Sequence, residues 1–577
     1  MKRYWKYIRP YLSAFIIGPT LMIVETIGEI ILPKFMAQII NNGIVPRNIP
    51  YIITMGVLMV LIAMLMAVGG VGAAYFGAKA SINFAADMRK DVFANVQKFS
   101  FSNIDKFSTG SLVTRLTNDI TQVQNLVNTC LRMMLRAPGM LIGAIIMAFV
   151  MNARLATVVL VVIPFLIVII IIVIRIAFPR FRILQEKMDR LNSAIRESVT
   201  NVRVIKSFVR DDFEQKKFED ANGDLKESSL RAFRVMITTM PLMGLIMNST
   251  IIAVVWFGGK QIMAGDMPVG DLTAFITYVT QILMSLLMSS FIILQSARAI
   301  ASGKRINEVL DCVSDINDNN AAHPELTVVK GEVEFKDVTF RYYKNTGEPV
   351  LDKINLKIES GETVGIIGST GCGKTTLVQM IPRLYDTDEG EVFVDGVNVK
   401  DFSLKNLREG VSMVLQKNVL FSGSILENLQ WGDEDASFEE IRRVADMAQA
   451  DGFVTGFEEG YETDLGQGGV NVSGGQKQRL CIARAMLKKP KILILDDSTS
   501  AVDTATEAEI RKNLKDYCPD TTKIIIAQRI TSVIDANKIV VMDDGKITGI
   551  GTHDELMQSC EAYKEIYYSQ MDKEVNA

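Results

Sequence analysis

Six long apolar stretches precede residue 300, and they limit the possible folds more than any other feature of the sequence. They cover residues 11–32, 51–78, 137–153, 155–174, 235–259 and 272–297. A helix needs about 20 apolar residues to cross a bilayer, and only the first stretch carries charges, Glu25 and Glu29. We therefore predict a membrane domain of six transmembrane helices, with the lipid bilayer as its surroundings.

Lys and Arg set the expected orientation of the spans, because cytoplasmic loops carry an excess of them. Four basic residues precede the first span, and residues 79–136 and 175–234 are rich in Lys and Arg. On the other side, the turn at residues 43–50 carries only Arg47 as a basic residue, and the loop at residues 260–271 carries only Lys260. This asymmetry predicts a multi-pass protein of the inner (cytoplasmic) membrane, with both termini in the cytoplasm.

The two basic segments are expected to form long helical hairpins. Proline is absent from residues 79–136 and 180–234, and each of these ranges contains a single glycine. Helices that continue a span project from the membrane by about 1.5 Å per residue and must turn back near their middle. Each tip then either contacts a partner or is a solvated hairpin without one, and the pattern by itself leaves both readings open.

The chain changes character after residue 300. Residues 315–325 are polar and contain a proline, which is typical of a linker. Beyond residue 330, apolar strands alternate with helical patterns and indicate an α/β domain. We predict a membrane domain at 1–300, a linker at 301–330 and the α/β domain at 331–577. The net charge of −3 argues against nucleic acid as a partner.

The α/β domain contains a phosphate-binding loop. Gly368, Gly373, Lys374 and Thr375 satisfy the pattern G-x-x-x-x-G-K-[ST] between an expected strand and helix. Backbone N–H groups of such a loop surround phosphates, the lysine adds positive charge, and the Thr375 hydroxyl suits Mg²⁺. The sequence therefore predicts a site for ATP and Mg²⁺. Its candidate residues are Gly368, Ser369, Thr370, Gly371, Cys372, Gly373, Lys374, Thr375 and Thr376.

A second apolar strand ends in two carboxylates, in the stretch ILILDDSTSAVD at residues 492–503. We expect Asp496 to contact the Mg²⁺ through a bound water, and Asp497 is the candidate group for activating an attacking water. The residues around Asp497 decide whether its side chain is long enough for that role.

A second Ser–Gly–Gly turn opens an amphipathic helix at VSGGQKQRLCIARAM, residues 472–486. This turn is a second candidate phosphate-binding site, although the glycine loop is already expected to bind the domain's own nucleotide. This duplication suggests two chains, each offering this turn to the ATP of the other. The candidate residues are Ser473, Gly474, Gly475 and Gln476.

Taken together, these motifs resemble those of ABC exporter half-transporters over essentially the whole chain. The resemblance implies an all-α six-helix transmembrane domain with long intracellular helices, followed by an α/β P-loop ATPase domain. It implies that Tyr342 stacks on adenine, although a strand aromatic in the core is an alternative. It further implies that Gln416 links Mg²⁺ to the membrane domain and that Asp503 communicates across the dimer. Short coupling helices at the hairpin tips would seat on the ATPase domains.

Two positions depart from the family pattern. Asp497 stands where the family usually has Glu, and Gln528 stands where it usually has His. Asp is shorter by roughly 1.5 Å, and a displacement of about 1 Å in a catalytic group can cost ~10²-fold in rate. Gln donates a hydrogen bond but carries no positive charge. The chain thus resembles the degenerate-site subunit of a bacterial heterodimeric exporter, whose signature loop completes the competent site of a second, different half-transporter.

The substrate is the least determined feature. Several Met and aromatic residues would suit a cavity for amphipathic, drug-like compounds, or could pack helix against helix; they are Met240, Met243, Met247, Phe275, Tyr278, Met284, Met288 and Phe291. One alternative is export of a lipid, a peptide or a metabolite. Another is that the chain is an ATP-gated regulatory subunit that does not pump. We expect Glu25 and Glu29 to line the outward-facing cavity or its gate; the alternative is that the helix extends into solvent.

Overall fold

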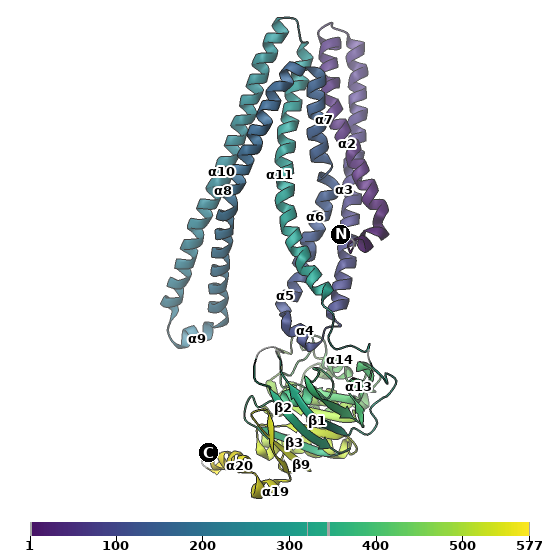
Figure 1. Ribbon diagram of the computed structural model, residues 1–577, viewed down its shortest axis with the longest axis vertical. Coiled ribbons are helices and arrows are strands. Elements are labelled where there is room, and N and C mark those ends of the chain that lie inside the picture. The colour runs from purple at the N-terminus through teal and green to yellow at the C-terminus, as the bar shows by residue number, and fades with distance from the viewer. Residues whose placement is uncertain (1–2, 320, 343–346, 576–577) are drawn as a thin grey trace. The chain divides into compact units, whose positions relative to one another are not determined.

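The computed structural model describes residues 3–319, 321–342 and 347–575, without the side chains of residues 290, 291, 293, 294, 297 and 571–575. The chain folds into two compact units (Figure 1). The helical unit comprises residues 1–96 and 110–311, and the α/β unit comprises residues 97–109 and 312–577.

The helical unit confirms the prediction of six spans, since six helices among the described residues are long and apolar enough to cross a membrane. Apart from residues 11, 152 and 153, each predicted stretch lies in one of the long helices α2 (Leu12–Ile39), α3 (Ile49–Val96), α7 (Arg136–Met151), α8 (Ala153–Thr200), α10 (Asp211–Met263) and α11 (Val269–Asp311). The shorter elements are α1 (Trp5–Ile8), η1 (Arg9–Tyr11), η2 (Ile40–Ile44), α5 (Thr109–Thr114), η3 (Arg115–Asp119), α6 (Ile120–Met133) and α9 (Val202–Ser207).

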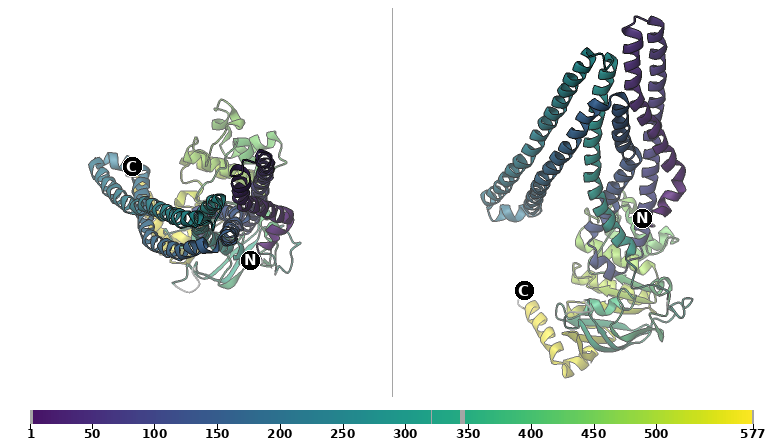
Figure 2. Two further views of the ribbon diagram at one scale, coloured as in Figure 1. Left: turned by 90° about the horizontal axis from the view of Figure 1, so that it is seen from above. Right: turned by 45° about the horizontal axis from the view of Figure 1, so that its top comes forward.

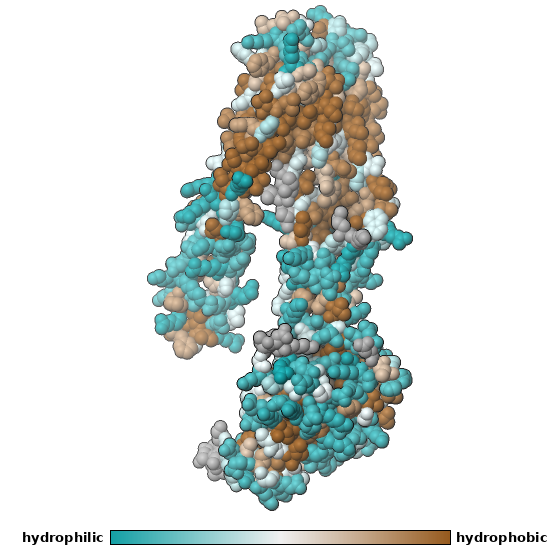
Figure 3. Space-filling model, in the orientation of Figure 1, coloured by the Kyte–Doolittle hydropathy of each residue, from teal (hydrophilic) through white to brown (hydrophobic). Residues whose placement is uncertain are grey.

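Large apolar side chains cover the outside of these helices. Val57, Leu61, Leu65 and Val68 follow helical spacing along α3, and all four are exposed. Figure 3 shows a broad hydrophobic surface over the spans and a hydrophilic surface on the parts of α8 and α10 nearest α9. Apolar surface of this extent is unfavourable in water, so this face is the one that the bilayer covers.

The second hairpin consists of α8 and α10, joined at its tip by α9. The two helices lie side by side and diverge from α2 and α3 of the same unit (Figure 2). Four apolar residues around the tip are exposed: Val202, Val204, Phe208 and Val209. The expected hairpin is therefore present, and its tip carries apolar surface that its own unit leaves uncovered.

Proline shapes the first span and ties it to the last. Pro33 lies within α2 and has no N–H, so the carbonyl of Glu29 loses its usual helical donor. Gln281 of α11 replaces that donor, with its Nε2 2.9 Å from the Glu29 oxygen. The Tyr278 hydroxyl donates to the Ile30 carbonyl at 2.8 Å. Because lipid offers no hydrogen bonds, these side chains satisfy a backbone that would otherwise be costly to bury.

The larger sheet of the α/β unit has the strand order β10-β9-β3-β8-β7-β6. Its five strands from β9 to β6 are parallel, and β10 is antiparallel to β9. Strands β7 and β8 are buried along their whole length, as expected for continuous apolar runs covered on both faces. The strands are β3 (Thr363–Gly368), β6 (Val411–Val414), β7 (Ile492–Asp496), β8 (Thr522–Ile526), β9 (Lys538–Asp543) and β10 (Lys546–Gly551).

A smaller antiparallel sheet has the order β2-β1-β4-β5 and comprises β1 (Val333–Phe340), β2 (Leu351–Ile358), β4 (Glu389–Val394) and β5 (Val397–Asn398). The helices of the unit are α4 (Phe101–Lys106), α12 (Lys374–Gln379), α13 (Leu404–Gly410), α14 (Ile425–Gln430), α15 (Phe438–Met447), α16 (Asp451–Val454), α17 (Gly474–Leu487), α18 (Thr504–Tyr517), α19 (His553–Ser559) and α20 (Glu561–Val575). The 3₁₀ turns are η4 (Gly460–Glu462) and η5 (Ile530–Ser532). The fold class predicted from the sequence is thereby confirmed.

The hydrogen bond from Gln281 gives a direct test of the link between α11 and α2. Gln281→Leu preserves the approximate size of the side chain but leaves the Glu29 carbonyl without a donor. We expect the thermal unfolding of the full chain in lipid nanodiscs to report a loss of about 1–3 kcal/mol. Thr280→Val, which removes only a bond to the helix's own Ile276 carbonyl, is the matched control. Equal stability of the two variants would contradict the assignment.

Candidate functional site

The phosphate-binding loop lies at the carboxyl edge of the parallel sheet, between β3 and α12. Gly368, Gly371 and Gly373 all have positive φ angles, of 152°, 88° and 96°. A Cβ atom at Gly368 would lie 2.0 Å from the Met542 carbonyl oxygen, and one at Gly373 would lie 2.7 Å from that of Val350. Side chains at these positions would therefore clash with backbone, and glycine is required for the loop to close.

Most of the predicted nucleotide residues line one cavity of about 960 Å³. They are Tyr342, Gly368, Ser369, Thr370, Gly371, Gly373, Lys374, Thr375, Thr376, Gln416, Asp496, Asp497 and Gln528. Cys372 is buried behind the loop and does not line the cavity. The volume is at the upper end of the range typical of small-molecule sites.

Lys374 and Tyr342 lie at different parts of this cavity. The Lys374 Nζ donates to the carbonyls of Gly368 and Ser369 at 2.9 and 2.7 Å, which holds its charge over the loop. Tyr342 is 43% exposed and is therefore not a core aromatic. Its hydroxyl shares a hydrogen bond with the Thr376 Oγ1 at 2.9 Å, so the ring is fixed beside the loop.

The residues expected to hold Mg²⁺ meet at the ends of β7 and α12. The Thr375 hydroxyl donates to the Asp496 Oδ1 at 3.0 Å. The second oxygen of Asp496 is buried and has no hydrogen-bond partner among the described residues. Burial raises the pKa of Asp496, and the hydrogen bond from Thr375 opposes that rise. A hydroxyl and one carboxylate fit Mg²⁺, which keeps several waters and takes further ligands from phosphates.

Asp497 and Gln528 contact one another directly across neighbouring strand ends. The Gln528 Nε2 donates to the Asp497 Oδ2 at 2.6 Å. Asp497 also adopts a left-handed backbone, with φ of 47°. Burial raises the pKa of its carboxyl, whereas hydrogen bonds from Gln416 and Gln528 lower it. Asp497, the candidate catalytic carboxylate, thus already accepts a hydrogen bond from the Gln528 amide.

Helix α20 adds a residue that the sequence analysis missed. Gln570 lines the nucleotide cavity, its Nε2 donates to the Gln528 carbonyl at 2.8 Å, and its Oε1 accepts from the Ile530 N–H at 2.8 Å. Both ends of this amide therefore hold the backbone of the segment that carries Gln528. The sequence offers no signal for this contact, since an isolated glutamine on a C-terminal helix belongs to no motif.

The predicted signature residues lie apart from this cavity. Ser473 and Gln476 form a capping box at the start of α17, with bonds of 3.3 and 2.8 Å. None of the residues from Ser473 to Gln476 is among those lining the chain's own nucleotide cavity. Asp503 caps α18 by accepting from the Thr506 N–H at 3.0 Å, and it does not line the cavity either. Within one chain, therefore, these groups do not meet the phosphate loop.

Glu25 and Glu29 share one arginine within the helical unit. The Arg136 guanidinium lies 3.2 Å from a Glu25 oxygen and 2.5 Å from a Glu29 oxygen. The two carboxylate side chains are only 15% and 22% exposed. The second oxygen of each carboxylate is buried and has no hydrogen-bond partner among the described residues. Two carboxylates thus share one guanidinium within the helical unit, and sequence reasoning had not identified Arg136.

The Met and aromatic set divides into two groups. Met240, Met243, Met247 and Met284 line an apolar cavity of about 200 Å³ between α8, α10 and α11. Phe275 and Tyr278 are fully buried in helix packing, Met288 does not line the cavity, and the side chain of Phe291 lies outside the described residues. Four of the methionines thus line a small apolar cavity, whereas Phe275 and Tyr278 pack helix against helix.

Comparison with protein families gives two matches, one in each unit. A family model described as "ABC transporter transmembrane region" matches residues 15–286. A second, described as "ABC transporter", matches residues 351–500.

Relatives match over nearly the full length. The uncharacterized ABC transporter ATP-binding protein YfiB of Bacillus subtilis is 39% identical over 574 residues, which cover 100% of this chain and 99% of that protein. The putative multidrug export ATP-binding/permease protein YgaD of the same organism is 32% identical, with 98% of each chain covered. The ATP-dependent lipid A-core flippase of Desulfotalea psychrophila is 32% identical over 84% of each chain.

Removing Gln570 tests whether α20 holds the segment next to Asp497. Gln570→Ala deletes both hydrogen bonds to this segment, so amide exchange across residues 528–532 should accelerate by about tenfold or more, the equivalent of one or two such bonds. Hydrogen–deuterium exchange of the full chain measures this rate. Gln558→Ala, at an exposed position of the neighbouring helix α19, should leave it unchanged. An unaltered exchange rate in Gln570→Ala would show that the contact contributes nothing.

Proposed function

The chain belongs to the ABC transporter family, as an ATP-driven exporter half with fused transmembrane and ATPase units, and we propose that its own nucleotide site is the degenerate site of a heterodimer. In this proposal the site binds ATP and hydrolyses it slowly. The chain's signature loop completes the competent site of a second, different half-transporter. The ATP-driven cycle moves an amphipathic compound out of the cytoplasm.

The observation that carries the proposal is the hydrogen bond between Gln528 and Asp497. A water attacking the γ-phosphate needs a free carboxylate oxygen within hydrogen-bond reach. Here the carboxylate is one methylene shorter than the Glu usual in the family, and its Oδ2 accepts the Gln528 amide at 2.6 Å. The amide also adds no positive charge beside the phosphate. Both features favour retention of ATP over its hydrolysis.

The remaining residues of the cavity have binding roles in this proposal. Tyr342 stacks on adenine, the loop N–H groups and Lys374 hold the phosphates, and Gln416 faces the metal. Thr375 and Asp496 would hold Mg²⁺, which would neutralise charge on the phosphates. Asp496 is held ready for this role by the Thr375 hydroxyl at 3.0 Å. None of these positions departs from the family pattern, which supports binding without efficient turnover.

The need for a second chain is supported by two surfaces. Ser473 to Gln476 do not line the chain's own cavity, so contact with ATP requires a partner's cavity. The α/β unit also has a groove of about 320 Å³ whose wall includes Phe421 and Trp431, exposed rings that stack 4.1 Å apart. A hairpin tip with exposed apolar side chains, like the tip around α9, is complementary to the exposed aromatic rings of such a groove. We infer that each chain's tip seats on the other chain, with both termini in the cytoplasm.

The apolar cavity in the helical unit supports the proposed substrate class. Four Met side chains give it an adaptable lining, suited to the hydrophobic part of an amphipathic compound. One relative is named a putative multidrug export protein and another a lipid A-core flippase, and both names are compatible with this class of compound. ATP-dependent accumulation in inverted vesicles, with the partner present, distinguishes this function from a regulatory subunit that does not pump.

We propose further that Glu25 and Glu29 form a gate that favours cationic substrates, because the pair exceeds the charge of Arg136 by one. Glu25→Gln with Glu29→Gln should reduce transport of cationic amphiphiles several-fold relative to neutral ones. A buried arginine left unpaired can cost about 3–5 kcal/mol, so a triple variant that adds Arg136→Gln controls for stability. If the triple variant transports cationic and neutral substrates at the same relative rates as the wild-type chain, the gate proposal is contradicted.

Repair of the two departures tests the degenerate site itself. Asp497→Glu with Gln528→His should raise hydrolysis at this site tenfold or more, equivalent to ~1.4 kcal/mol of activation free energy. The partner's site must carry a Glu→Gln change, so that the turnover measured comes from this chain's site. The single variants are matched controls and should each gain less, because groups acting on one phosphate are non-additive. Fast hydrolysis at the unrepaired site would overturn the proposal.

A further inference from the structure

Three aromatic rings connect the nucleotide cavity to α4, the short helix in the segment between α3 and α5 that belongs to the α/β unit. The ring of Tyr342 packs edge-on against that of Tyr385, with centroids 5.3 Å apart and planes at 89°. Tyr385 in turn lies 5.9 Å from the ring of Phe101, the first residue of α4. Tyr342 therefore has one side toward the cavity and another against a ring that contacts α4.

A hydrogen bond strengthens this connection at the other end of α4. The Tyr385 hydroxyl donates to the Asp105 Oδ2 at 2.9 Å. Burial raises the pKa of Tyr385, and the bond to Asp105 raises it further, so the hydroxyl keeps its proton at physiological pH. Hydrogen bonds to charged groups are among the stronger ones in proteins. A change in the position of Tyr385 is thereby transmitted to Asp105 through a directional contact.

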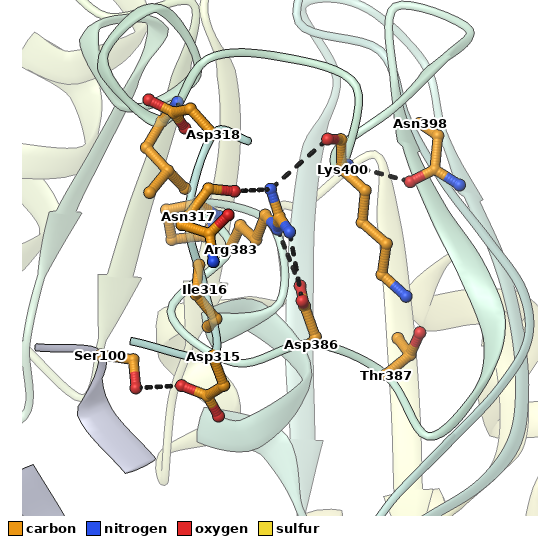
Figure 4. Close-up of polar contacts among 12 residues, drawn as sticks. Ser100, Asp315, Ile316, Asn317, Asp318, Arg383, Asp386, Thr387, Asn398 and Lys400 are labelled. Carbon is orange, nitrogen blue, oxygen red and sulfur yellow. Dashed lines mark hydrogen bonds and ion pairs between the residues drawn. The ribbon is translucent and has the colours of Figure 1, made fainter. Parts of the chain in front are cut away.

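The loop that carries Tyr385 is held rigidly by Arg383. This arginine is buried and has a positive φ of 51°, a backbone conformation that L-residues rarely adopt. Its guanidinium pairs with Asp386 at 2.8 and 3.2 Å and donates to the carbonyls of Asn317 and Lys400 (Figure 4). These bonds fix the loop on both sides of Tyr385. Tyr385 therefore cannot shift without a change in the position of its neighbours.

The start of α4 is attached to the same part of the unit. Asp315 accepts from the Ser100 hydroxyl (Figure 4) and from the Ser102 hydroxyl, the latter at 2.7 Å. Although burial acts in the opposite sense, these bonds lower the pKa of Asp315 and keep it ionised. Ser100 is also the N-cap of α4. Both ends of the helix are therefore tied to the α/β unit, one through Asp315 and the other through Tyr385.

We propose that Tyr385 is a positioning residue that links occupancy of the adenine site to α4. When a base stacks on Tyr342, the edge contact fixes Tyr385, and Tyr385 orders Asp105 and Phe101. The base of the nucleotide, and not only its phosphates, then determines how firmly α4 is held. This inference rests on the proposed stacking role of Tyr342 and goes beyond it, because it assigns a route from that ring to α4.

Hydrogen–deuterium exchange of residues 101–106 in the purified full chain tests the route without measuring turnover. ATP, added with EDTA so that it binds without hydrolysis, should slow exchange in α4, whereas inorganic triphosphate should not. Tyr385→Phe keeps all three rings and removes only the hydroxyl. It should reduce the ATP effect about tenfold, the equivalent of one hydrogen bond to a charged group. Bound nucleotide is quantified in the same samples.

The chain provides a matched control. Tyr461 donates to the Asp451 Oδ1 at 2.8 Å, a similar tyrosine–carboxylate bond elsewhere in the α/β unit. Tyr461→Phe should leave the response of α4 to ATP intact. If Tyr385→Phe binds ATP poorly, Asp105→Ala replaces it, because this variant removes the acceptor of the same hydrogen bond. It should reduce the effect of ATP on exchange in α4 to the same extent.

Two results would overturn the inference. One is an equal effect of triphosphate and ATP on α4 in the wild-type chain. The other is a wild-type response in both Tyr385→Phe and Asp105→Ala. Failure of the stacking role is a different result: Tyr342→Ala would then bind ATP as tightly as the wild-type chain.

Discussion

The parallel pairing of β3, β8 and β7 is the constraint on which the nucleotide site depends. Because these strands run in the same direction, their carboxyl ends bring Gly368, Gln528 and Asp497 to one edge of the sheet. The glycine loop closes against backbone that no side chain could approach, and the two polar side chains meet directly at 2.6 Å. The same alignment that assembles the phosphate loop therefore also brings together the two residues that, in our proposal, slow hydrolysis at this site.

The sequence predicted the features that depend on local pattern and little of what depends on tertiary pairing. Long uncharged runs identified the spans, and the glycine spacing identified the loop, because both requirements act within a few residues of one another. Arg136, Gln570 and Tyr385 were not predicted, since their partners lie far away in the sequence and none belongs to a motif. Apolar pattern likewise could not separate the cavity-lining Met240 from the packed Phe275, because both are simply hydrophobic.

The arrangement of the sites is consistent with the dimer of unlike halves that we propose. Its ATP cavity contains the phosphate loop and the metal-binding groups, whereas Ser473 and its neighbours line no part of that cavity. In our proposal, a single chain therefore holds one half of each of two composite sites. The departures at Asp497 and Gln528 affect only the cavity half. Ser473 through Gln476 match the family pattern, so in our proposal the chain keeps the signature loop that a competent partner needs.

The ATPase rate of the purified full-length chain tests this account most directly. It should be measured alone and after assembly with a second half-transporter that carries Glu and His at the two corresponding positions. The account predicts little turnover by the chain alone and robust turnover by the assembled pair, with one competent site per pair. Robust turnover by the chain alone would contradict it, because Asp497 would then be an adequate catalytic group and the chain could operate as a symmetric dimer.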